Sequence, residues 1–105
     1  MKLKIKETER AIYASGNFTR ESMVHQISAT AYDGHLHVEI VPPSYSAKQV
    51  ANKLIEALGE PEEPPRVRES FSDCGEESGS LLVSWKGDLK KHEWIEKLAE
   101  VLKDE

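Results

Sequence analysis

Three side chains of types that bind metal ions recur at every second position of one short stretch. They are His35, His37 and Glu39. Side chains two residues apart on a β-strand project from the same face, and zinc accepts two such histidines with a nearby carboxylate as ligands. A structural zinc site requires four ligands, however. We therefore keep metal binding through these three residues as an alternative and favour a solvent-facing polar surface.

The other side chains with reactive or ligating groups lack the neighbours that such chemistry requires. Reactive cysteines need electropositive surroundings, whereas the single cysteine, Cys74, lies among Asp73, Glu76 and Glu77. These carboxylates do not follow the EF-hand spacing either. The sequence contains no P-loop and no nucleophile elbow. We therefore predict that the chain is not an enzyme and uses no cofactor.

The elements that would position these side chains are organised around a predicted hairpin over residues 26–41. Its centre is Asp33-Gly34, a dipeptide that favours the type I′ turn with positive φ at both central residues. This turn pairs Tyr32 with His35 and joins residues of like polarity along the ladder, as a correct register should. The face predicted to lie in the core carries Ile27, Ala29, Ala31, Leu36, Val38 and Ile40. The face predicted to meet solvent or a partner carries Ser28, Thr30, Tyr32, His35, His37 and Glu39.

Two further histidines and a tryptophan are predicted to lie outside this polar face, in the core or on a helix. His25 shares the strand parity of the predicted core residues, so we expect a hydrogen-bonded structural histidine there. His92 falls in the first turn of a predicted helix, where we expect it at the surface. Trp94 lies at the border of that helix's apolar stripe, and a partly exposed tryptophan can anchor a partner because large aromatic side chains dominate interface energies. The candidate binding residues are therefore Thr30, Tyr32, His35, His37, Glu39 and Trp94.

Two helices are predicted from their capping residues and apolar stripes. Ser46 has the sequence context of an N-cap in a capping box, and Gly59 has that of the residue that ends a helix. The first helix should therefore cover residues 47–58. Asp88 is the predicted cap of the second helix, which should run from residue 89 to about residue 103.

Short stretches of alternating or ambiguous pattern near the N-terminus predict the remaining strands of the sheet. Residues 2–6 alternate lysine with apolar residues, as an edge strand does, and residues 10–14 form a second short strand before a loop at 15–17. Residues 19–26 fit helical spacing as well as strand spacing. We favour a strand from Met23, because it continues the register of the hairpin.

The order of these elements indicates two strand–strand–helix units. The first covers residues 23–58, and the second covers residues 67–103 with strands at 67–72 and 81–85. The proline- and glutamate-rich segment 59–66 is the extended connector between them.

The length and charge of the chain limit the class of protein that it can form. The sequence has 105 residues and a net charge of −5, which suit one α+β domain over residues 1–105. We expect an antiparallel sheet of four to six strands with two helices packed on one face. The order would be one or two short strands, then strand–strand–helix twice. The other face of the sheet would stay uncovered.

The sequence also indicates the compartment. One cysteine allows no internal disulfide, and we find neither a signal peptide nor an apolar run long enough to span a membrane. We expect a cytoplasmic protein of microbial origin that makes no membrane contact.

These features favour a small acidic interaction or regulatory protein. It would bind another protein through the open sheet face or through the acidic stretch 60–77, since an acidic surface meets a basic one on a partner. A homodimer through the open face or a free edge is a further possibility.

Two alternative functions remain open. The first is a metal- or small-ligand-binding domain, with or without enzymatic activity, that uses His35, His37 and Glu39. The second is nucleic-acid binding, which the acidic net charge disfavours. It would use the basic N-terminal residues Lys2, Lys4, Lys6, Arg10 and Arg20.

Overall fold

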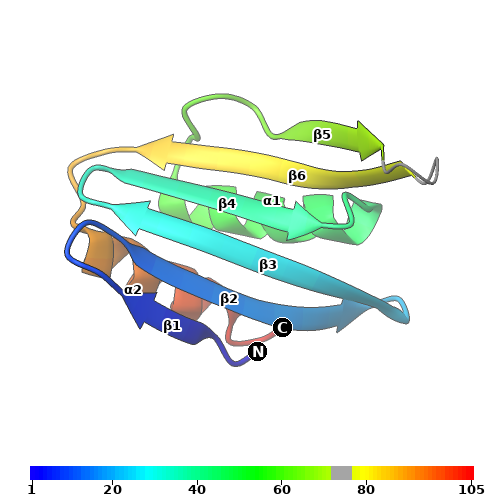
Figure 1. The fold of residues 1–105 in the computed structure, drawn as a ribbon, viewed down its shortest axis with the longest axis horizontal. Coiled ribbons are helices and arrows are strands. Elements are labelled where there is room, and N and C mark those ends of the chain that lie inside the picture. Colours follow the sequence, from blue (N-terminus) through cyan, green and yellow to red (C-terminus); the bar gives the residue numbers. More distant parts are fainter. Residues whose placement is uncertain (72–76) are drawn as a thin grey trace.

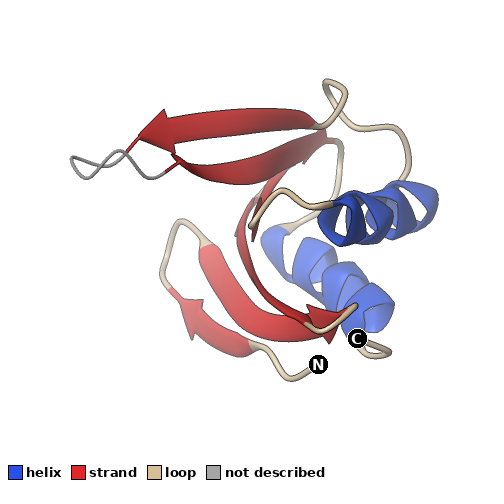
Figure 2. Ribbon diagram, turned by 90° about the vertical axis from the view of Figure 1, so that its right-hand side faces the viewer, coloured by secondary structure: helices blue, strands red, loops and turns tan. Residues whose placement is uncertain are grey.

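The computed structural model describes residues 1–71 and 77–105 of the chain. The elements are β1 (Lys4–Glu7), β2 (Ile12–Arg20), β3 (Met23–Tyr32), β4 (His35–Val41), α1 (Tyr45–Leu58), β5 (Arg66–Phe71), β6 (Glu77–Lys86) and α2 (Lys91–Leu102). The six strands form one antiparallel sheet in the order β1-β2-β3-β4-β6-β5. Both helices cover the same side of this sheet (Figures 1 and 2). The predicted α+β fold is confirmed.

The register of the β3–β4 hairpin is the predicted one. Tyr32 pairs with His35, and the ladder continues to Ile27 opposite Ile40. The six residues predicted for the core face are each at most 4% exposed. The turn type is different from the prediction, because Gly34 has a φ of 87° while Asp33 has no positive φ. Asp33-Gly34 is therefore not a type I′ turn.

The strand β2 is longer than predicted. Residues 15–17 continue the strand instead of forming a loop, and they pair with β3. A Cβ atom on Gly16 would lie 3.1 Å from the carbonyl oxygen of Lys2 and 3.1 Å from the Sδ of Met1. The glycine therefore serves the close approach of the N-terminal segment and not a turn. The strand reading of residues from Met23 onward is confirmed.

Both helices begin at positions other than the predicted ones. The N-cap of α1 is Ser44, whose side chain accepts a hydrogen bond from the backbone N–H of Ala47. The predicted cap, Ser46, is a buried residue of the first turn. The helix still ends before Gly59, whose backbone N–H donates to the carbonyl of Ile55.

The N-terminus of α2 is capped from another part of the chain. Its N-cap residue is Lys90, not Asp88. The carboxylate of Asp33, in the β3–β4 turn, accepts a hydrogen bond from the backbone N–H of Lys91 at 3.0 Å. A carboxylate at this position also faces the positive end of the helix dipole. The prediction of Asp88 as the cap was wrong, because the carboxylate that accepts the hydrogen bond, Asp33, lies 58 residues before Lys91 in the sequence.

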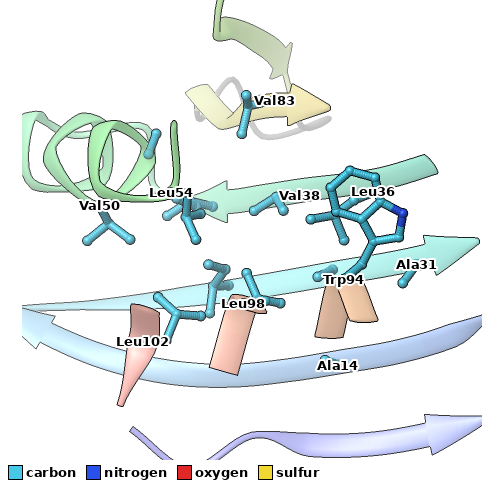
Figure 3. Packing of buried hydrophobic residues seen from close by; sticks show 14 of the residues in the cluster. Ala14, Ala31, Leu36, Val38, Val50, Leu54, Val83, Trp94, Leu98 and Leu102 are labelled. Carbon is cyan, nitrogen blue, oxygen red and sulfur yellow. The ribbon is translucent and has the colours of Figure 1, made fainter. Parts of the chain in front are cut away.

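The core fills the space between the helices and the sheet. Side chains of both helices point toward the inner face of β3 and β4 in Figure 3. Trp94 is 2% exposed and belongs to this core, so the prediction of a partly exposed tryptophan is wrong. The labelled members of the cluster are Ala14, Ala31, Leu36, Val38, Val50, Leu54, Val83, Trp94, Leu98 and Leu102.

His25 is the buried, hydrogen-bonded histidine that its parity predicts. It is fully buried, its Nδ1 lies 3.1 Å from the carbonyl oxygen of Met23, and its Nε2 lies 2.5 Å from the Oγ of Ser44. Its ring stacks on Phe18 with centroids 4.8 Å apart. His92 is exposed, as predicted, and lies 2.8 Å from a carboxylate oxygen of Glu7.

Candidate functional site

The sheet side away from both helices is the candidate functional site, and we call it the open face. Figure 1 looks onto this side. Its side chains alternate along each strand with the buried ones, so the register places them in rows across the sheet. One row spans five strands and consists of Lys6, Tyr13, Thr30, His37 and Ser84. The next row spans all six strands and consists of Lys4, Ser15, Ser28, Glu39, Leu82 and Arg66.

Aromatic and imidazole rings gather on the central strands β3 and β4, at the end of the open face next to the turn that joins them. The rings of His35 and His37 stack with centroids 5.8 Å apart, and Tyr32 meets His37 edge-on at 6.1 Å. Thr30 lies directly opposite His37 and separates it from Tyr13 on β2. The structure therefore brings together most of the predicted binding residues.

The predicted site residues do not all share this surface. Thr30, Tyr32, His35, His37 and Glu39 lie on the open face, whereas Trp94 lies in the core on the opposite side of the sheet.

The three candidate metal ligands do not form a compact site. His35 and His37 stack as parallel rings, and Glu39 is one row further along the strand, opposite Ser28 and Leu82. Within residues 1–71 and 77–105, no group of three His, Cys, Asp or Glu side chains is placed to hold a metal ion. Cys74, Asp73 and Glu76 lie outside the described residues.

Cations collect on the open face of an acidic chain. The described strand positions of this face carry a single carboxylate, Glu39, although the net charge of the chain is −5. The cations on the same face are Lys4, Lys6, Arg66, Arg68 and Lys86. They lie toward both margins of the sheet, with the rings between them. The acidic residues are therefore concentrated elsewhere in the molecule.

Two hollows flank the ring cluster. The smaller, of about 120 Å³, is lined by residues of β4, β5 and β6 and by the connector that precedes β5, among them His37, Glu63, Arg66 and Ser84. The larger, of about 370 Å³, lies over β1, β2 and β3. Its polar lining comes from Lys4, Lys6, Tyr13, Ser15, Ser28 and Thr30. The open face is thus an uneven surface with a ring cluster between two depressions.

Only part of the cationic set was predicted from the sequence. Lys4 and Lys6 belong to the predicted basic N-terminal group, but Arg20 faces the helices and its Nε lies 2.6 Å from Glu105. Arg66 and Arg68 were missed, although their alternation around Val67 was a visible signal. Their face became clear only from the pairing of β5 with β6.

Comparisons with known proteins do not assign a function. No protein-family model, curated protein or solved structure matches this chain. Among the described residues, no helix combines the length and the apolar character needed to cross a bilayer. Functional inference therefore starts from the open face.

Proposed function

We propose that this chain is a binding module that takes another protein on its open face, with an acidic segment of that protein against the cations. The observation that carries this proposal is the charge distribution. Five cations and one carboxylate occupy the described strand positions of the open face, in a chain with a net charge of −5. Complementary charge steers encounter and excludes wrong partners.

The side chains of the open face are also suited to hold a partner after encounter. Tyr13 is 43% exposed and Tyr32 is 39% exposed. Tyrosine and arginine are enriched among the residues that carry most of the binding energy at protein interfaces. The cations supply orientation, and the tyrosines supply apolar area next to the two hollows.

The test compares capture by the wild type with capture by a charge-reversed open face. In the variant Lys6→Glu/Arg66→Glu, the cations at opposite margins are reversed while the core is untouched. The matched control is Lys90→Glu/Lys97→Glu, which reverses two exposed lysines outside the open face. Proteins from the native host that bind the wild type and the control, but not the variant, would be purified for affinity measurement.

The expected result is an acidic partner whose affinity falls about tenfold or more in the open-face variant, since each lost charge pair weakens binding. The affinity should also fall with added salt, because exposed charges are screened. Equal binding by the wild type and the open-face variant would contradict the proposal, as would the recovery of the chain with no partner.

A second candidate function is supported by the arrangement of rings between cations. Proteins that bind single-stranded nucleic acid stack bases on aromatic side chains and track the phosphates with basic ones. Tyr13 and Tyr32, with Lys6 on one side and Arg66 on the other, have this arrangement. The net charge of −5 opposes it, so we rank it second.

A nucleic-acid probe and the variant Tyr32→Ala separate the two functions. The probe is a fluorescein-labelled decathymidine strand, followed by fluorescence anisotropy. Binding that is lost in Tyr32→Ala and falls steeply with salt would favour nucleic acid. Absence of binding at low salt would remove this candidate and leave the protein partner.

A further inference from the structure

We propose that the free edge of β5 takes an extended acidic peptide, which adds a strand to the sheet and places apolar side chains in a groove between β5 and α1. This site goes beyond the open face. It lies at the margin of the sheet and extends to the helix side. β5 is the last strand in the sheet order, so its outer backbone groups face no further strand of the described sheet.

A groove follows this edge on the helix side. It has a volume of about 270 Å³ and is lined by Lys48, Ala51, Asn52, Pro65, Val67 and Leu81. Val67 is 44% exposed although it has the parity of the core residues, whereas Ala51 and Leu81 are each 1% exposed. Apolar atoms therefore remain uncovered at the point where the sheet ends.

The geometry of strand addition sets the chemistry of the occupant. A peptide that pairs with an edge strand gains main-chain hydrogen bonds, and pockets for alternate side chains give specificity. Side chains of the added strand would point in turn to the helix side and to the open face. On the helix side they would meet the groove beside Val67. On the open face they would meet Arg66 and Arg68, which favour carboxylates.

The same charges argue against a second copy of this chain that pairs through β5 with Val67 at the centre. Two β5 strands paired antiparallel around Val67 would place Arg66 of each copy opposite Arg68 of the other. Like charges directly opposite each other destabilise a strand pair. A peptide with alternating apolar and acidic residues meets no such repulsion, because its carboxylates would lie beside Arg66 and Arg68 on the open face.

The test uses a fluorescein-labelled octapeptide of alternating glutamate and valine. The control peptide has the same composition, with the glutamates and valines in separate blocks. We expect the alternating peptide to bind about tenfold more tightly, and to slow amide hydrogen exchange in β5. Equal binding of both peptides would overturn the proposal. Peptide-independent dimerisation through β5, measured by sedimentation equilibrium, would assign the edge to a second copy.

Two variants of α1 locate the binding site. Asn52 is exposed and lines the groove, so Asn52→Trp should fill the groove without touching the core. We expect this variant to weaken the alternating peptide about tenfold, whereas Asn52→Ala should leave its affinity unchanged. Tyr32→Ala on the open face should also leave it unchanged. If Asn52→Trp, with a wild-type circular dichroism spectrum, still binds the peptide normally, the groove is not the site.

Discussion

The carboxylate of Glu105 joins three parts of the molecule. Both of its oxygens accept hydrogen bonds from Arg20 on β2, at 2.6 and 2.9 Å, and Lys53 on α1 donates at 2.7 Å. Arg20 also donates to the side chain of Gln49 at 3.0 Å. The side chain of Glu105 is only 6% exposed. The bond from Arg20, followed by that from Lys53, lowers the pKa of Glu105 from 4.5 to about 2.

We expect Glu105→Gln to lower the free energy of unfolding by about 2 kcal/mol at neutral pH, because it removes charge-assisted hydrogen bonds. The carboxylate stabilises the folded state when it is ionised there. Its contribution is therefore complete above pH 4.5 and is lost as the pH falls toward 2.

Urea unfolding at pH 7 and at pH 3 measures this contribution. The difference between the wild type and Glu105→Gln should be smaller at pH 3. Glu100→Gln is the control, since Glu100 pairs with Lys103 at an exposed position where ion pairs contribute little. A difference that does not change between the two pH values would contradict the assignment.

Single residues differ in how far the sequence predicts them. Strand parity was enough to place His25 in the core and His37 outside it. The partner of His25 could not be predicted, because Ser44 follows it by 19 residues. Trp94 was misplaced because the exposed border of a helix depends on the elements that pack around it. Periodicity describes only the helix itself.

At the level of elements, the turns show how tertiary contacts override local preference. The β2–β3 turn has positive φ at both Glu21 and Ser22, 51° and 66°, as a type I′ turn requires. The Asp33-Gly34 turn, which has the favoured sequence, instead contacts the segment before α2. The N–H of Gly34 donates to the carbonyl of Leu89 at 2.8 Å. The position of this turn was predictable, but its type was set by that contact.

We expect Glu21→Asn/Ser22→Gly to raise the free energy of unfolding by about 1 kcal/mol, because asparagine and glycine adopt positive φ with less strain than glutamate and serine. Thermal unfolding followed by circular dichroism measures the change. Gly34→Ala is the opposing control, and it should destabilise the protein by about 1 kcal/mol, since Gly34 has a φ of 87°. An unchanged or lower melting temperature for the double variant would show that this turn is not strained.

At the level of the whole molecule, the pairing of β4 with β6 joins the two strand–strand–helix segments. Six residue pairs connect these strands, from His35 opposite Lys86 to Ile40 opposite Leu81. The helices α1 and α2 also contact each other. The sequence predicted the two segments and the side that the helices cover. It did not predict which strands are neighbours across the join, because β4 and β6 are separated by a helix and another strand.

We expect the chain to unfold in one cooperative transition, since the two segments share a sheet and a hydrophobic cluster. Trp85 and Trp94 both belong to the second segment, so their fluorescence reports on that segment, whereas far-UV circular dichroism reports on both. The two urea unfolding curves should coincide. Separate midpoints would show that the segments unfold independently.

Because buried and outward side chains alternate, selection or design can change the residues of the open face without changing those of the core. Val38 lies in the core while its neighbours His37 and Glu39 point outward, and the same holds along β3. Substitutions at exposed positions usually change stability by less than about 0.5 kcal/mol. A library that varies the row from Lys6 to Ser84 would therefore explore new binding specificities on a backbone whose stability is encoded in the intervening residues.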